Sequence, residues 1–155
     1  APVGDETSPG RHTLNKYGGE IGVSVRFLAS EQIRQLVEMA EQARAALSGF
    51  VGYEVAYDST ALQLLDEWID RHLRQFSDPS QKVRLLWASF LGEMFRRHHE
   101  GEWVIQESGG RQGLVVLCPT GEGGTYEVDV LDRVSRRITR GMSASLVYFY
   151  TVTSI

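Results

Sequence analysis

"GEWVIQESGGRQGLVVLCPTGEGGTYEVDVL", residues 101–131, is the stretch that decides the fold of this 155-residue chain. Its three runs of strand-forming residues, WVIQE, LVVLC and YEVDVL, are separated by two connections rich in glycine. Glycine readily adopts the positive backbone angles that tight connections between strands require. The stretch therefore predicts a three-stranded antiparallel meander.

Helical periodicity occupies most of the chain before this meander. Ser30 is a candidate N-cap for a first helix, whose apolar spacing stops at Gly49. Asp58, or one of the two hydroxyl residues after it, caps a second helix with a wide apolar stripe. Asp78, followed by a proline at the first helical position, starts a third helix that stops at Gly101.

Four further segments carry shorter patterns. The alternation in IGVSVRF, residues 21–27, predicts a strand, and VGYEVAY, residues 51–57, predicts a second strand or extended segment. DRVSRRITRG, residues 132–141, predicts a short helix that its glycine ends. SASLVYFYTVTSI, residues 143–155, fits a helix or a strand, and its β-branched and aromatic residues favour a strand.

The length of the chain fits one domain, which needs no disulfide or metal to fold. Residues 1–20 combine prolines, glycines and scattered charge without an apolar period, which predicts a flexible N-terminal tail. Residues 21–155 place their helices and strands in separate blocks. We therefore expect a single α+β domain, with helices packed on one face of a small antiparallel sheet.

Composition restricts the compartment and the partners. A net charge of -4 gives no general attraction to nucleic acid or to an anionic membrane. No apolar run reaches the roughly 20 residues of a membrane span, and the first residues lack a signal-peptide pattern. The single cysteine, Cys118, rules out an internal disulfide and is expected to be a buried, inert thiol. We expect a cytoplasmic protein with no membrane partner and no nucleic-acid partner.

The two adjacent histidines of MFRRHHEGEW, residues 94–103, raise the question of a metal site. At about 100° per residue, His98 falls on the apolar arc of the third helix with Arg97 at its edge, whereas His99 falls on the polar side. Adjacent helical side chains diverge, so this pair cannot bind one metal ion. We expect no metal and no cofactor, and we interpret Arg96 and His99 as part of a solvated helix end.

The second helix carries one histidine and three carboxylates that need interpretation. His72 lies near the middle of the apolar stripe, so we expect a core histidine bonded to backbone or to a carboxylate. Asp66, Glu67 and Asp70 fall on the polar side of the same helix. They are expected to be solvated.

Glu93 is the best isolated acid in the sequence. It borders the apolar face of the third helix, four residues before Arg97, and a helix ion pair explains that spacing. The alternative is an active or metal-dependent site, in which Glu93, Arg97 and His98 line a cleft beside the sheet.

Four arginines form the most concentrated charge in the chain. Their spacing of i, i+3, i+4 and i+7 puts them on one helix face: Arg133, Arg136, Arg137 and Arg140. Guanidinium groups suit carboxylates and phosphates, so the face fits an acidic protein or a phosphorylated ligand. The alternative is a solvated face without a partner. Under either reading we expect substitution of Arg133 and Arg137 to leave folding nearly intact.

The segment STALQLLDEWIDRHL followed by LGEMFRRHHEGEW resembles bacterial domains of unknown function, over about residues 58–150. In those domains a helix with a leucine-glycine-glutamate sequence leads into a glycine and a tryptophan that opens a sheet. The matching positions are Leu91, Gly92, Glu93, Gly101 and Trp103. The resemblance implies the α+β arrangement and no known activity. Independently, a glycine in mid-helix predicts close packing by another element at Gly92.

These observations favour one function over another. The sequence combines a sound core with no assembled catalytic motif, which indicates a non-enzymatic binding or accessory domain of a bacterial protein. The alternative is an enzyme or metal-dependent protein that uses the cleft at Glu93, Arg97 and His98.

Overall fold

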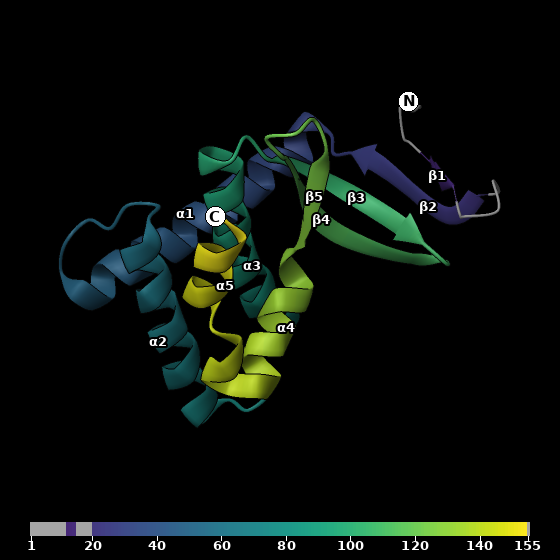
Figure 1. Ribbon diagram of the computed structural model, residues 1–155. Helices are drawn as coiled ribbons and strands as arrows, with labels where there is room; N and C mark the ends of the chain where they lie inside the picture. The colour runs from purple at the N-terminus through teal and green to yellow at the C-terminus, as the bar shows by residue number, and fades with distance from the viewer. Residues whose placement is uncertain (1–11, 15–19, 155) are drawn as a thin grey trace.

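A computed structural model of the protein describes residues 12–14 and 20–154, with side chains from residue 23 onward. It confirms the expected α+β class (Figure 1). The strands are β1 (His12–Leu14), β2 (Glu20–Phe27), β3 (Glu102–Ser108), β4 (Arg111–Pro119) and β5 (Thr125–Asp129). The helices are α1 (Ser30–Val51), α2 (Ser59–Gln75), α3 (Gln81–His98), α4 (Val130–Arg140), the 3-10 turn η1 (Gly141–Ala144) and α5 (Leu146–Thr153).

The sheet follows the order of the chain, β1-β2-β3-β4-β5, and every neighbouring pair is antiparallel. The predicted meander is therefore confirmed as β3, β4 and β5, and the predicted strand at residues 21–27 joins it as β2. Strand β1 falls inside the segment expected to be a tail. The rest of that segment, residues 1–11 and 15–19, lies outside the described residues. Figure 1 shows β2, β3 and β4 extending away from the helices.

The core surrounds α3, which packs against the other helices and the near end of the sheet. Trp103 on β3 faces Val116 on β4 across the ladder, and both side chains are buried in the core. A Cβ added at Gly92 of α3 would stand 2.0 Å from the Trp103 ring. This contact confirms the close packing predicted at Gly92. Cys118 is also buried, as expected, and burial raises the pKa of its thiol.

Residues 51–57 were expected to form a strand or an extended segment, and the strand is wrong, because α1 continues two residues past Gly49 to Val51. Its C-cap is Gly52, whose φ of 80° suits glycine. The segment that follows is irregular, and side chains of α1 satisfy its backbone. The Val55 amide donates to Ser48 Oγ at 3.0 Å, and Arg44 donates to the Val55 carbonyl at 2.8 Å. Val55 itself is buried, which explains the apolar alternation without a strand.

The helix caps correct three further predictions. Asp58 caps α2 as expected, but the N-cap position of α1 is Ala29 instead of Ser30, and the Gln32 side chain accepts from the Ala29 amide at 2.9 Å. Helix α3 is capped by Ser80, whose Oγ accepts from the Val83 amide at 3.2 Å, and it ends at His98 before Gly101. Asp78, the predicted cap, instead forms an ion pair with an arginine one turn inside the helix. Asp78 and Ser80 both offer an oxygen acceptor near the start of α3, and the Ser80 hydroxyl is the one that accepts from the helix backbone.

The C-terminal segment is a helix, so the strand favoured at residues 143–155 is wrong. Ser145 caps α5 by accepting from the Tyr148 amide at 3.2 Å. The carboxylate of Asp66 on α2 also accepts from the amides of Leu146 and Val147, at 3.1 Å each. A carboxylate at a helix start satisfies orphan amides and suits the positive end of the helix dipole. This tertiary contact overrides the strand propensity of the segment.

We predict opposite effects for alanine at two helical glycines. Gly92→Ala should destabilise the fold by about 3 kcal/mol or more, because the new methyl group overlaps the buried Trp103 ring. Gly49→Ala should stabilise it by roughly 0.5–1 kcal/mol, because α1 has open space there and alanine favours helix. Urea unfolding of both variants measures the difference. Equal effects at the two sites would contradict this account of Gly92.

Candidate functional site

The charged residues singled out from the sequence lie in two clusters and on one surface. The Glu93 cluster joins α3 to β3 and contains Glu93, Arg96, Arg97 and Trp103. The Asp66 cluster joins α2, α4 and α5 and contains Asp66, Asp70, Arg137 and Ser145. The surface is the α4 arginine face, formed by Arg133, Arg136 and Arg140.

Glu93 is fully buried, and three donors occupy its carboxylate. Arg96 Nε lies 2.5 Å from Oε2, Arg97 Nε lies 2.9 Å from Oε1, and Trp103 Nε1 donates to Oε2 at 3.0 Å. Burial alone would raise the pKa of Glu93, but the hydrogen bonds from Arg96, Trp103 and Arg97 lower it below its usual value. The group is therefore an ionised structural carboxylate with a 0% exposed side chain.

Tyr57 extends the Glu93 cluster to the loop between α1 and α2. The guanidinium of Arg97 lies 3.9 Å from the centroid of the Tyr57 ring, and the Tyr57 hydroxyl donates to Glu41 on α1 at 2.6 Å. Burial, and then the Glu41 carboxylate, raise the pKa of Tyr57 well above its usual value. His98 is exposed, and its Nε2 lies 2.7 Å from the Tyr57 carbonyl oxygen. These contacts anchor the loop that was predicted to be a strand.

The structure reverses the predicted placement of the two adjacent histidines. His98 was expected on the apolar side and is exposed, whereas His99 was expected to be solvated and is half-buried. His99 is the C-cap of α3, so its backbone leaves the helical path and the helical projection no longer applies. Its Nε2 lies 3.0 Å from the Tyr150 hydroxyl and 3.1 Å from Ser154 Oγ. Burial, with the nearby His98, lowers the pKa of His99. Arg96, also expected to be solvated, binds Glu93 instead.

Asp66 and Arg137 form a buried ion pair between residues 71 positions apart. Arg137 Nε donates to Asp66 Oδ1 at 2.7 Å, and the side chains are 0% and 2% exposed. Nη2 of Arg137 also lies 2.7 Å from Asp70 Oδ1. Ser145 Oγ donates to the second oxygen of Asp66 at 2.9 Å. The prediction that Asp66 is solvated is therefore wrong, and Arg137 does not belong to an exposed face.

The α4 arginine face retains the other three predicted residues. Arg136 pairs with Asp132 at 2.8 Å on the surface. Among the described residues, Arg133 and Arg140 have no carboxylate within ion-pair distance. Arg133 lies 4.0 Å from the centroid of the Phe149 ring on α5. Its pKa is lowered, first by burial and then by the charge of Arg136, with a smaller effect of Arg140, while the carboxylates of Asp132 and Asp129 oppose this shift. The three cations are thus close enough to repel one another.

His72 lies near the C-terminal end of α2, and its side chain forms no hydrogen bond among the described residues. Its ring packs edge-on against Trp87, at 5.3 Å between centroids, and lies 5.0 Å from Phe76. It also lines a surface hollow of about 310 Å³ at the connection between α2 and α3. The expected bond to backbone or carboxylate is replaced by packing against rings.

The described residues contain no group of three or more side chains placed to bind a metal ion. None of the helices within this part of the chain is long and apolar enough to cross a membrane. Comparison of the chain with protein families, characterised proteins and solved structures finds no match. The resemblance to the bacterial domains therefore stays a prediction, and function must be argued from the geometry.

Sequence reasoning did not find the buried role of Asp66 or the contact between Arg133 and Phe149. One signal was present, since Asp66 lies four residues after Leu62 and three before Ile69, both buried on the same face of α2. A helical projection ranks faces by hydrophobicity, so it assigns a buried carboxylate to the solvent. Only the position of Arg137 on another helix shows that Asp66 is buried and paired.

We predict that Asp66→Asn destabilises the protein by about 3 kcal/mol, because it leaves the buried Arg137 charge with only the partly exposed Asp70 as a counter-charge. The matched change Asp132→Asn breaks the surface pair with Arg136 and should cost less than about 1 kcal/mol. Urea unfolding, followed by far-UV circular dichroism, measures both. Similar losses would show that Asp66 contributes no more than a surface carboxylate.

We also predict that the contribution of Glu93 to stability depends on pH. Because its folded-state pKa is lowered, the carboxylate stabilises the fold at pH values above its unfolded pKa of about 4.3. That contribution is lost as the pH falls through the lower folded-state pKa. The free energy of unfolding lost in Glu93→Gln should therefore be largest near neutral pH and shrink below about pH 4. Glu100→Gln, at an exposed glutamate nearby, is the control for surface charge. A loss in Glu93→Gln that is the same at every pH would contradict the prediction.

Proposed function

We propose that the protein is a non-enzymatic binding domain, whose α4 arginine face binds an acidic segment of a partner protein. The observation that carries the proposal is the unequal use of charge on α4. Arg137 is buried in the core and paired with Asp66, whereas Arg133 is partly exposed and Arg140 is exposed, and neither forms an ion pair among the described residues. Arg136 is paired with Asp132, so Arg133 and Arg140 are the guanidinium groups of this face that an added anion can pair with.

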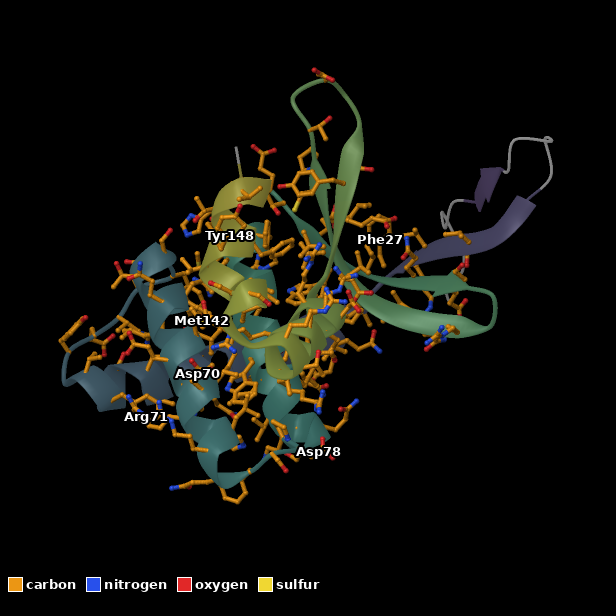
Figure 2. The ribbon with its side chains drawn as sticks, turned by 60° about the horizontal axis from the view of Figure 1, so that its bottom comes forward. Phe27, Asp70, Arg71, Asp78, Met142 and Tyr148 are labelled. Carbon is orange, nitrogen blue, oxygen red and sulfur yellow. The ribbon has the colours of Figure 1, made fainter. Side chains whose placement is uncertain are left out.

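Aromatic side chains on α5 support a protein as the anionic partner. Phe149 lies beneath the Arg133 guanidinium, and the neighbouring Tyr148 is 68% exposed. Figure 2 shows Tyr148 on the outer side of α5. Tyrosine and arginine are enriched where proteins bind proteins, because they combine a large contact area with directed hydrogen bonds. Carboxylates of an acidic segment can pair with the arginines while apolar side chains meet the rings.

The alternative, an enzyme with a cleft at Glu93, Arg97 and His98, has weaker support. The carboxylate of Glu93 is 0% exposed and is already bonded to two arginines and Trp103. A general base must reach the proton that it removes, and a lowered pKa makes it a poorer base. Arg97 and His98 are exposed, but Arg97 is already paired with Glu93. The geometry therefore supports a structural role for Glu93 better than a catalytic one.

The proposal predicts charge-dependent binding of acidic peptides. Fluorescence anisotropy with a labelled glutamate-rich peptide should show binding that weakens strongly between about 50 and about 300 mM salt. Arg136→Glu with Arg140→Glu should weaken it at least about ten-fold, because like charges now face each other. Both side chains lie on the surface, so folding should be retained.

A matched control separates the face from net charge. Arg26→Glu with Arg74→Glu changes two exposed arginines elsewhere, so the total charge of the two double variants is equal. The control should bind within about two-fold of wild type. If both double variants lost the same affinity, the peptide would bind through general electrostatic attraction, which would contradict the proposal. If the same peptide carrying phosphoserines bound much more tightly, the partner would be a phosphorylated segment in place of an acidic one.

A further inference from the structure

Met142 in η1 places a reactive sulfur between solvent and a buried charge. Its side chain is 55% exposed, yet its Sδ lies 3.1 Å from Nη2 of Arg137, which is 0% exposed. Figure 2 shows Met142 on the same side of the molecule as Asp70, the exposed end of the Asp66 cluster. An oxidant in solution can therefore reach an atom that contacts the core ion pair.

The guanidinium of Arg137 is unevenly satisfied. Nη2 carries two hydrogens but lies within bonding distance of three acceptors: the Asp66 carbonyl at 2.9 Å, Asp70 at 2.7 Å and the Met142 sulfur. Nη1 is buried and has no hydrogen-bond partner in the described part of the chain. A buried donor without an acceptor reduces stability. The cluster therefore lacks one acceptor at Nη1, on the same guanidinium group whose Nη2 contacts the Met142 sulfur.

We propose that Met142 is a site of oxidation by hydroperoxides, and that the resulting sulfoxide oxygen accepts a hydrogen bond from Arg137. In the reaction a sulfur lone pair attacks one peroxide oxygen, and the O–O bond breaks. For hydrogen peroxide, one oxygen ends on sulfur and the other leaves as water after a proton shift. Sulfur loses two electrons and the peroxide gains them, so the step balances without a further reactant.

The other two methionines lack this arrangement. Met94 is 1% exposed in the core of α3, and Met39 is only partly exposed on α1. Access to solvent limits the oxidation of methionine, so the three residues should react at different rates. Among the described residues, neither Met39 nor Met94 forms a hydrogen bond with a charged side chain. They serve as internal controls within one molecule.

Oxidation at Met142 should strengthen the fold, whereas sulfoxides in apolar cores usually weaken it. A thioether sulfur is a weak acceptor, and the sulfoxide oxygen is a stronger one that the guanidinium can bond. The exposed position of Met142 means that little apolar packing is lost. The added hydrogen bond would hold η1, and with it the start of α5, more tightly to the Arg137 and Asp66 pair that joins α4 to α2. This inference is independent of the proposed binding function.

The test has two readouts on the full chain. Peptide mapping after brief treatment with hydrogen peroxide should show Met142 oxidised at least about ten-fold faster than Met94. In a Met39→Leu background, where Met142 is the single accessible methionine of the described residues, oxidation should raise the melting temperature by about 2 °C. The volume-conserving change at Met39 should itself be tolerated. Equal oxidation rates, or a melting temperature that stays the same or falls, would overturn the proposal.

Two substitutions at the site separate the added acceptor from general effects of peroxide. Met142→Gln supplies a carbonyl oxygen near Arg137 and should melt at or above the temperature of the reduced wild type. Met142→Leu removes the acceptor, so it should melt lower and should not respond to peroxide. A Met142→Leu protein as stable as Met142→Gln would contradict the role of the Arg137 contact.

Discussion

The carboxylate of Asp66 is the group on which the packing of the helices depends. It forms an ion pair with Arg137 on α4 and accepts hydrogen bonds from the Ser145 hydroxyl and from the first two amides of α5. A buried ion is costly unless all of its bonding capacity is used, so these partners must be in place together. One residue of α2 thereby sets the position of α4 and the conformation of the C-terminal segment. In Figure 1, α5 lies between α2 and α4, as this shared contact requires.

Glu93 applies the same constraint on the other side of the core. It connects α3 to β3 through Trp103, whose ring also fills the space that Gly92 leaves open. Its two arginines extend from the buried carboxylate toward the surface, and Arg97 reaches the loop after α1 through Tyr57. Both buried carboxylates are thus joints between elements distant in sequence. Acids that resemble catalytic groups in a sequence are, in this geometry, fully bonded structural groups.

This division leaves three of the four α4 arginines outside the core. Four arginines follow one another at helical spacing, and one of them, Arg137, is buried in the core. The others meet solvent beside the aromatic side chains of α5, so α5 contributes both to the Asp66 cluster and to the proposed binding surface. Changes in the cluster that move α5 would therefore also move the ring beneath Arg133. Stability and binding are coupled through this one short helix.

The sequence by itself determined the elements whose signals are local. Glycine-rich connections and alternating residues specify the meander, helical spacing specifies α2, α3 and α4, and a mid-helix glycine indicated the contact that Trp103 makes. Tertiary structure alone decided which arginine is buried, which histidine faces inward, and that residues 146–153 are helical. The reason is physical. A periodic pattern reports average burial along one element, whereas a buried charge depends on a partner such as Arg137, 71 positions from Asp66, that no local pattern specifies.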